Sequence, residues 1–238
     1  MSHHPRQLWS VSWVRKEDGS DQKAFAENDI IASFENGADA VVLINEFCPL
    51  SELESVISEC RKRFPDKCLG VNYLGDEKDP YGVFESFRLA HVYGLQLVWT
   101  DFSGVEAQSD KPTLDLVKVR EKQPESVFYA SGVHFKYAKP TPSQPSLEEA
   151  ALRALGFVDG VITTGEATSK ACSPDKARRL KNAVGNYPIG LASGVDAENV
   201  NEYLEWVDFF LVASSIQDPD RRFIGKNIKT LADAIHSY

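Results

Sequence analysis

The amino-acid sequence predicts an α/β protein that folds as a single (β/α)₈ barrel (TIM barrel). Short apolar segments rich in β-branched residues alternate with amphipathic segments along the chain, which is the pattern of successive β-α units. The 238 residues divide into eight such units of about 30 residues each. No change in composition marks a linker, so we expect residues 1–238 to form one domain.

The apolar segments predict eight strands. We expect them near residues 8–14, 38–44, 68–73, 95–100, 127–135, 158–163, 187–192 and 207–213. The segment Asp39-Ala-Val-Val-Leu-Ile44 is apolar at consecutive positions, as expected for a parallel strand that is buried on both faces. A doubly wound open sheet is the alternative, but no GxGxxG follows the first predicted strand.

The amphipathic segments predict eight helices with recognisable ends. We expect them near residues 21–36, 50–64, 80–93, 113–122, 146–155, 174–184, 197–206 and 227–236. Pro80 and Pro174 lie near first-turn positions, and Ser146 with Glu149 has the spacing of a capping box. Gly94 stands just past a predicted helix end. The segment 139–145 contains three prolines and predicts a loop over the barrel mouth.

Composition and charge exclude several function classes. Asp and Glu number 35 against 26 Lys and Arg, and a net charge of −9 argues against a general nucleic-acid binder. Apolar runs such as Ala40–Ile44 are far shorter than the roughly 20 residues of a membrane span. No segment near Met1 resembles a signal peptide. We therefore expect a cytoplasmic protein without a membrane span, whose four cysteines are free thiols.

Aromatic residues on the predicted helices suggest a homo-oligomer. They are expected to face either the barrel or a neighbouring subunit. These residues are Phe84, Phe87, Tyr93 and Tyr203.

A (β/α)₈ barrel carries its chemistry on the loops after the strands, so the residues there are the candidate site. These positions are unusually polar. Among them, we expect Trp13, Glu46, Asn72 and Thr164 to contact a substrate. The aromatic residues within the strands, among them Trp99, are expected in the core.

The last two predicted strands end in small residues that suit a phosphate. Ser193 and Gly194 follow one strand, and Ser214 and Ser215 follow the next. Barrels of this class often bind a phosphate between these two loops, where backbone N–H groups and a helix start can approach it. The alternative is that small residues only permit tight turns at both places.

His134 and Lys136 are the predicted catalytic pair. They are two residues apart, so on a strand their side chains share one face. In an enclosed pocket Lys136 could act as a base or form a Schiff base, and His134 could move protons near neutral pH. The alternative is structural: an ion pair of Lys136 with Glu166 or Asp101, and a hydrogen bond from His134 to a backbone carbonyl.

Carboxylates follow the second, fourth and sixth predicted strands. Glu46, Asp101 and Glu166 could serve as general bases, hold sugar hydroxyls or bind Mg²⁺. No histidine cluster accompanies them, so we expect neither a metal nor another cofactor, with Mg²⁺ as the alternative. Asp101 and Glu166 complete the predicted catalytic group.

Several segments resemble the BtpA/SgcQ family of TIM-barrel proteins, which are often labelled phosphoribosylanthranilate-isomerase-like. The segments are Val133-His-Phe-Lys-Tyr-Ala138 (V-H-V-K-H-A in the family), Asp159-Gly-Val-Ile-Thr-Thr-Gly-Glu-Ala-Thr168 (D-A-V-I-V-T-G-x-A-T) and Ser193-Gly-Val-Asp-Ala-Glu-Asn-Val200 (S-G-V-T-P-E-N-V). The resemblance extends over residues 127–215 and is weaker over 28–104. It implies pocket positions at Asn72, His134, Lys136, Thr164, Gly165, Thr168, Ser193 and Gly194.

The sequence departs from this family at two places. Tyr137 replaces a second histidine, and the segment 13–19 replaces an H-L-x-P-L-P-G motif. Either difference could change the substrate or remove the activity. One family member is associated with stabilising a photosynthetic membrane complex, so the resemblance also allows an assembly role.

Two functions follow as expectations. The first is an enzyme, an isomerase, epimerase or lyase, acting on a small phosphorylated metabolite such as a sugar phosphate or a phosphoribosyl compound. Lys136 and His134 would stand next to the reacting carbons, with Asp101 or Glu166 as proton-transfer partner. The second is a non-catalytic assembly or regulatory factor that retains the barrel and an anion site.

Overall fold

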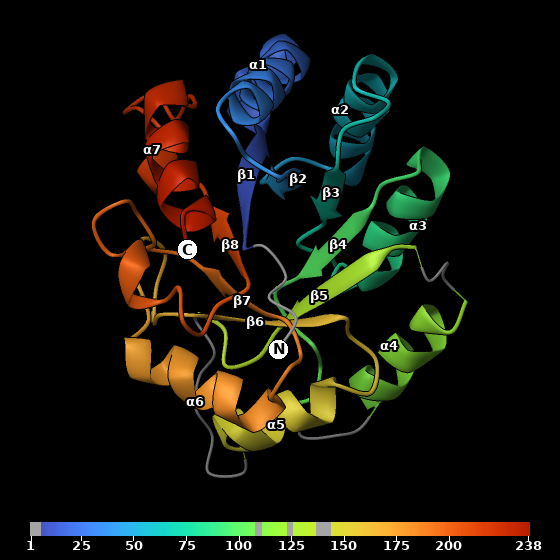
Figure 1. The fold of residues 1–238 in the computed structure, drawn as a ribbon. Coiled ribbons are helices and arrows are strands. Elements are labelled where there is room, and N and C mark those ends of the chain that lie inside the picture. Colours follow the sequence, from blue (N-terminus) through green and yellow to red (C-terminus); the bar gives the residue numbers. More distant parts are fainter. Residues whose placement is uncertain (1–5, 108–110, 123–125, 137–143) are drawn as a thin grey trace.

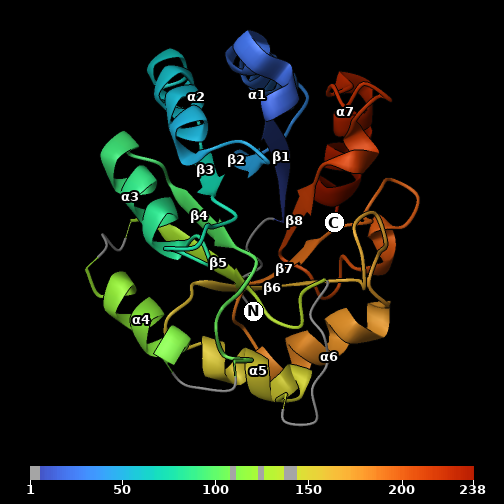
Figure 2. The same ribbon diagram turned by 180° about the vertical axis from the view of Figure 1, so that it is seen from behind.

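A computed structural model describes residues 6–107, 111–122, 126–136 and 144–238 of the chain, without the side chains of Ser20 and of residues 111–114. Eight parallel strands pair in chain order, and β1 also pairs with β8, which closes the barrel. Helices α1 to α7 surround the strands (Figures 1 and 2). The predicted fold class is confirmed.

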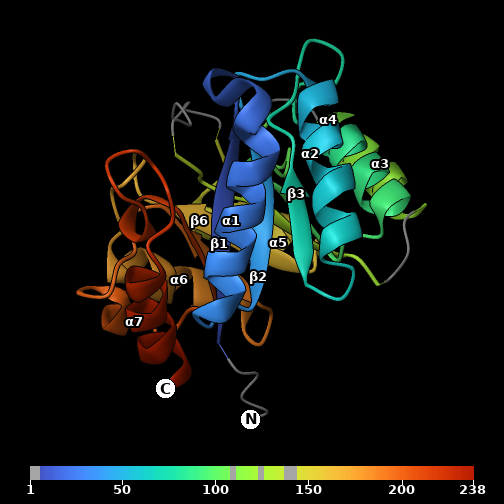
Figure 3. The ribbon, with the colours of Figure 1, turned by 90° about the horizontal axis from the view of Figure 1, so that it is seen from above.

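The strands are short, and the helices lie outside them. The strands are β1 (Gln7–Arg15), β2 (Ala40–Glu46), β3 (Leu69–Asn72), β4 (Leu97–Thr100), β5 (Phe128–Gly132), β6 (Gly160–Thr164), β7 (Ile189–Ala192) and β8 (Phe209–Val212). The helices are α1 (Gln22–Glu35), α2 (Leu50–Arg63), α3 (Val83–Tyr93), α4 (Lys111–Arg120), α5 (Leu147–Ala154), α6 (Pro174–Val184) and α7 (Gly225–His236). Figure 3 shows α1 and α2 lying alongside β1 to β3.

Aromatic residues fill the amino-terminal part of the barrel interior. Trp9 stacks on Phe209 with a centroid distance of 4.3 Å, and Phe128 meets both rings edge-on. Glycines on neighbouring strands leave the space for them: a Cβ atom at Gly190 would lie 2.3 Å from the Phe209 ring. This packing forms a solid floor beneath the barrel mouth, so a ligand can enter only from the carboxyl ends of the strands.

The α-helix predicted over residues 197–206 is wrong. Only a single 3₁₀ turn, η2 (Val200–Glu202), forms between β7 and β8. The Asp196 carboxylate accepts hydrogen bonds from the N–H groups of Glu198 and Asn199 at 2.9 and 3.0 Å. The Asn199 amide donates to the Gly194 carbonyl at 2.8 Å. Such local bonds between side chain and backbone compete with helix formation.

The strand predicted over residues 127–135 ends at Gly132. His134 has a φ of 45°, so the chain leaves the extended conformation there. His134 and Lys136 therefore lie in the loop after β5, and the prediction that they share a strand face is wrong. A Cβ atom at Gly132 would lie 2.1 Å from the Asp101 carbonyl oxygen, which shows how tightly the chain turns against the neighbouring loop. Of the predicted loop 139–145, residues 139–143 lie outside the described part of the chain, as does Tyr137.

Backbone strain is concentrated at one end of the barrel. Five described residues other than glycine have a positive φ, and each follows the carboxyl end of a strand. They are Phe47, His134, Ser169, Ser193 and Arg221. A positive φ is energetically unfavourable for residues that carry a Cβ atom, and such residues often lie at functional sites.

Two further predictions concern the chain as a whole. The four cysteines are free thiols, as predicted. Among the described helices, none has both the length and the apolar character needed to cross a membrane.

Candidate functional site

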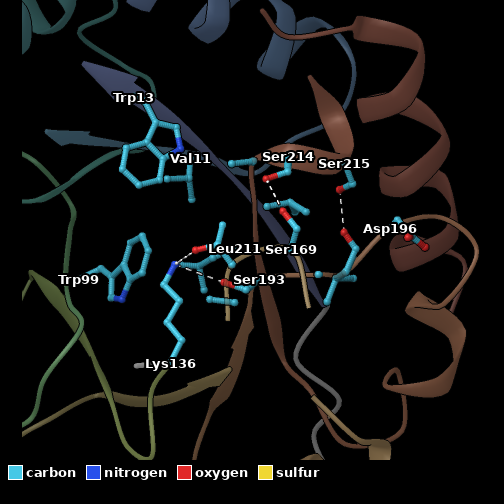
Figure 4. A pocket seen from close by; sticks show the side chains of 16 residues that line it. Val11, Trp13, Trp99, Lys136, Ser169, Ser193, Asp196, Leu211, Ser214 and Ser215 are labelled. Carbon is cyan, nitrogen blue, oxygen red and sulfur yellow. Dashed lines mark hydrogen bonds between the residues drawn. The ribbon is translucent and has the colours of Figure 1, made fainter. Parts of the chain in front are cut away.

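A cavity of about 270 Å³ opens at the carboxyl ends of the strands (Figure 4). Apolar residues of β1, β7 and β8 form its base, among them Val11 and Leu211. Trp13 and Trp99 contribute aromatic surface from the ends of β1 and β4. The loops after β5, β6, β7 and β8 supply its polar groups, so the cavity lies where this fold usually places its chemistry.

Lys136 is the cationic group of the cavity. Its Nζ atom lies 3.3 Å from the Thr168 hydroxyl and 3.4 Å from the Ser193 hydroxyl. Within the described part of the chain, no carboxylate oxygen lies within 4.0 Å of this ammonium group. The alternative ion pair with Glu166 or Asp101 is therefore not formed, and the positive charge is available to an anion.

Close packing of two loops shapes the polar wall of the cavity. Ser193 and Gly194 have φ angles of 69° and 74°, so the chain turns sharply after β7. A Cβ atom at Gly194 would lie 2.0 Å from the backbone nitrogen of Ala171, so only glycine lets the loop after β6 approach this turn. This approach holds Thr168 and Ser169 at the cavity.

The serines predicted to bind phosphate meet at this wall. Ser214 receives a hydrogen bond from Ser169 at 3.0 Å, and Ser215 donates to the Val195 carbonyl at 2.7 Å. The residues after β8 form a short 3₁₀ turn, η3 (Ser214–Ile216), instead of an α-helix start. Neither the residues directly after β7 nor those directly after β8 begin an α-helix, so the groups at this wall that can bind an anion are Lys136, hydroxyl groups and backbone N–H groups.

Asp101 and Asn72 form a polar pair beside the cavity. The Asn72 amide donates to the Asp101 carboxylate at 3.1 Å. Asp101 directly follows β4, which ends at Thr100, and it is close enough to Lys136 for the two charges to interact. Burial raises the pKa of the Asp101 carboxyl group, and the positive charge of Lys136 and the Asn72 hydrogen bond oppose this rise. Burial thus favours the protonated form of this carboxyl group, whereas the nearby ammonium group favours the ionised form.

His134 does not line the cavity. Its Nε2 atom lies 2.8 Å from the Pro145 carbonyl oxygen, and its backbone N–H donates to the Glu106 carboxylate. The structural alternative for this histidine, a hydrogen bond with a backbone carbonyl, is the contact observed. Lys176 anchors the same segment, because the ammonium group of this half-buried residue donates to the carbonyls of His134 and Thr164 at 2.9 and 2.6 Å.

Three other predicted site residues also lie away from the cavity. Glu46 is paired with Arg15 at 3.2 Å and with Arg221 at 2.9 Å. Thr164 is buried, and its hydroxyl donates to the Gly165 carbonyl, whereas Glu166 is exposed. The structure thus brings together Trp13, Lys136, Ser193, Gly194, Ser214 and Ser215 from the predicted set.

The cavity includes residues that sequence reasoning placed elsewhere or missed. Trp99 was expected in the core, and it is only 4% exposed, yet part of its surface lines the cavity. Thr168 was indicated only by the family resemblance. Ser169 and Asp196 were not predicted, and no residue pattern marks them, because loop conformation alone brings them to the wall. Among the described residues, no group of three or more His, Cys, Asp or Glu side chains could hold a metal ion.

Known structures resemble the fold over nearly the whole chain. Thiamine phosphate pyrophosphorylase from Pyrococcus furiosus superposes with a TM-score of 0.66 at 14% identity, covering 97% of this chain and 96% of that one. The (S)-3-O-geranylgeranylglyceryl phosphate synthase from Thermoplasma acidophilum, in complex with sn-glycerol-1-phosphate, gives 0.65 at 10% identity, covering 99% and 95%. Phosphoribosyl anthranilate isomerase from Thermus thermophilus gives 0.60 at 13%, covering 97% and 98%. Identities this low show the fold alone.

Comparison with related sequences identifies the family, which the structural comparisons do not. The photosystem I biogenesis protein BtpA of Synechocystis sp. is 22% identical over 210 residues, which cover 81% of this chain and 71% of the relative. An uncharacterized protein of Thermococcus kodakarensis is 24% identical over 160 residues, which cover 64% and 58%. The model of the BtpA family matches residues 66–230, well over half of the chain. The chain therefore belongs to the BtpA family.

Proposed function

We propose that the chain binds a small phosphorylated molecule in the cavity at the carboxyl ends of the strands. The observation that carries this proposal is the Lys136 ammonium group, which lies 3.3 and 3.4 Å from the hydroxyls of Thr168 and Ser193 and, within the described part of the chain, forms no ion pair with a carboxylate. In a protein with a net charge of −9, this cation lies in a concave site lined by serines, with the carboxyl group of Asp101 close enough for the two charges to interact. A phosphate against Ser193, Gly194 and the 214–215 turn would accept hydrogen bonds and neutralise that cation.

The proposed activity is proton transfer on this ligand, as in an isomerase, an epimerase or an aldol-type lyase. Each of these reactions needs a base and a group that stabilises an enolate or an imine. Asp101, whose pKa is raised by burial, and Lys136, whose charge acts on that carboxyl group, would take these roles. His134 would act from outside the cavity, through the position of the loop that carries Lys136.

The fold comparisons support the ligand class. Several structural neighbours carry a phosphorylated compound in their names, and one was solved with sn-glycerol-1-phosphate bound. Barrels of this class often hold phosphate between the loops after the seventh and eighth strands, which in this chain carry the serines. The reaction itself does not follow from the fold.

A binding experiment tests the proposal. Titration calorimetry with ribose 5-phosphate, with ribose as the uncharged comparison, should show binding of the phosphorylated sugar only. Lys136→Met and Ser193→Ala should weaken it, while Lys23→Met, which removes an exposed lysine of α1, should not. At 100 times its Kd the ligand should stabilise the fold by about 2.7 kcal/mol. The proposal fails if a panel of small phosphorylated molecules gives no binding, or binding that Lys136→Met leaves unchanged.

Borohydride trapping separates two roles for Lys136. If its amine condenses with a carbonyl carbon of the ligand and releases water, reduction of the imine fixes the ligand to the protein. Mass spectrometry should then find the modified lysine at position 136. A purely electrostatic role predicts no modification at this residue while ribose 5-phosphate still binds.

A second candidate function, a non-catalytic assembly factor, is favoured by exposed apolar residues on the same rim. Phe47 is 86% exposed, and Leu74 and Phe102 are each 40% exposed. Complementation of a strain that lacks the gene distinguishes the two functions. An assembly role predicts that serine at these three positions abolishes complementation and that Lys136→Met does not. The homo-oligomeric state and the cytoplasmic location stay predictions, which sedimentation velocity and cell fractionation would test.

A further inference from the structure

The cavity has two chemically different sides. In Figure 4, Trp13 and Trp99 lie opposite Ser214 and Ser215, and the Lys136 ammonium group stands between the two sides. The base between them is apolar, with Val11 and Leu211 among its residues. One molecule that fills the cavity would therefore touch hydroxyl groups at one end and aromatic surface at the other.

The aromatic side suits a flat ring better than a chain of hydroxyl groups. Aliphatic side chains offer no hydrogen-bond partner to a sugar hydroxyl, and the face of an indole ring is only a weak acceptor, so burying such a hydroxyl there costs free energy. A flat ring instead gains apolar contact and ring stacking, and a nearby ammonium group adds attraction to its π face. Trp13 is half-buried at the end of β1, so part of its ring is accessible to a ligand.

The volume limits the size of the ligand. About 270 Å³ lies just below the usual range of ligand pockets, about 300–1,000 Å³. A phosphate, a short linker and one ring fit this space, whereas a dinucleotide does not.

We propose that the ligand is an aromatic or heteroaromatic monophosphate, whose ring lies against Trp13 and Trp99 while its phosphate contacts the 193–194 and 214–215 turns. This inference rests on the proposed function and adds the substrate class. Trp13 and Trp99 are then the residues that determine specificity, and Trp13 belongs to the segment in which this chain departs from the H-L-x-P-L-P-G motif that its family resemblance implies.

Two probes of equal charge and similar size test the inference. Phenyl phosphate and cyclohexyl phosphate differ in the flatness and π system of the ring. We expect calorimetry to give phenyl phosphate about tenfold higher affinity, which corresponds to about 1.4 kcal/mol. Trp13→Leu should remove this preference and leave the affinity for inorganic phosphate unchanged. Trp13→Phe, which keeps a flat ring, should retain most of it.

The controls separate failure of the inference from failure of the proposed function. Trp206→Leu changes a half-buried tryptophan outside the cavity and should leave both affinities unchanged. Equal affinities for the two probes, both weakened by Lys136→Met, would overturn the aromatic ligand and keep the phosphate site. The aromatic ligand would also be overturned if the Trp13→Leu and Trp99→Leu variants, each with a native circular dichroism spectrum, still bound phenyl phosphate more tightly than cyclohexyl phosphate. Binding of neither probe would overturn both proposals.

Discussion

Asp29 of α1 is a buried carboxyl group outside the cavity, and it makes the stability of the barrel depend on pH. Burial raises its pKa to about 6, although hydrogen bonds from Ser12 and from the N–H of Phe223 and the charges of two arginines lower it. Ser12 donates at 2.7 Å from the adjacent strand β1. The group therefore takes up a proton in the folded protein at a pH where the unfolded chain, with a pKa of 3.8, is still ionised.

We predict that Asp29→Asn removes part of the pH dependence of unfolding. Because the folded pKa is raised, ionised Asp29 destabilises the fold above pH 6, and this cost is relieved as the pH falls toward 4. Between pH 7 and pH 5 the native chain should gain about 1 kcal/mol relative to the variant. Urea unfolding at the two pH values measures this difference. Asp233→Asn, at an exposed position of α7, serves as control, and an equal pH response of the native chain and Asp29→Asn would contradict the prediction.

Gly194 is required because the loops after β6 and β7 approach each other closely at this residue. We predict that Gly194→Ala costs more stability than Gly94→Ala. Both residues have a positive φ, but a Cβ atom at Gly94 meets nothing within 4 Å, whereas one at Gly194 meets the Ala171 nitrogen at 2.0 Å. Gly94→Ala should cost about 1 kcal/mol for its backbone alone. Gly194→Ala should cost more and also weaken ribose 5-phosphate binding. Equal thermal shifts for the two variants would show that the loops rearrange freely.

At the level of elements, the caps predicted at Ser146 and Pro174 are present, whereas α3 begins only at Val83, so Pro80 lies before the helix. The helix predicted between β7 and β8 does not form. The predicted capping box is present, because the Glu149 N–H donates to the Ser146 hydroxyl at 3.2 Å and the Ser146 N–H donates to Glu149 at 2.9 Å. Residues 197–206 have enough apolar positions for a helix, but Asp196 and Asn199 satisfy the backbone locally. Local side-chain bonds outweigh helix propensity there.

Asn199 should therefore be important for this segment. We predict that Asn199→Ala lowers the free energy of unfolding by about 1–2 kcal/mol, because it removes the bond to the Gly194 carbonyl and the bond from the Asp196 N–H. The turn at Gly194 loses its support, so the Kd for ribose 5-phosphate should rise as well. Asn201→Ala, at a neighbouring exposed position, is the matched control for both measurements. Similar values for the two variants would exclude this role of Asn199.

For the whole molecule, ring closure predicts cooperative unfolding. Strand β1 pairs with both β2 and β8, so the first and last units of the chain share one sheet without free edges. Tryptophan fluorescence reports mainly on the barrel interior through Trp9, Trp13 and Trp99, and far-ultraviolet circular dichroism reports on the outer helices. The two urea transitions should coincide. Separate midpoints would mean that part of the barrel unfolds independently.

The fold could be predicted from the sequence, but the site only in part. Strand periodicity places polar residues at one rim, but it does not say which loops turn inward. Lys136 reaches the cavity and His134 does not, because a left-handed residue reorients the chain between Gly132 and Lys136. Trp99 has the burial of a core residue and still lines the cavity, since the cavity begins where the core ends.

The concentration of left-handed non-glycine residues at this rim has a consequence for laboratory evolution. Glycine or asparagine at the five positions, Phe47 and Arg221 included, would relax the backbone. Selection for heat resistance alone should therefore accumulate such changes around the mouth. Variants altered at Ser169 or Ser193 should bind ribose 5-phosphate more weakly, whereas those altered at Phe47 or Arg221 should retain this binding. The same few backbone positions would then affect both thermal stability and ligand binding.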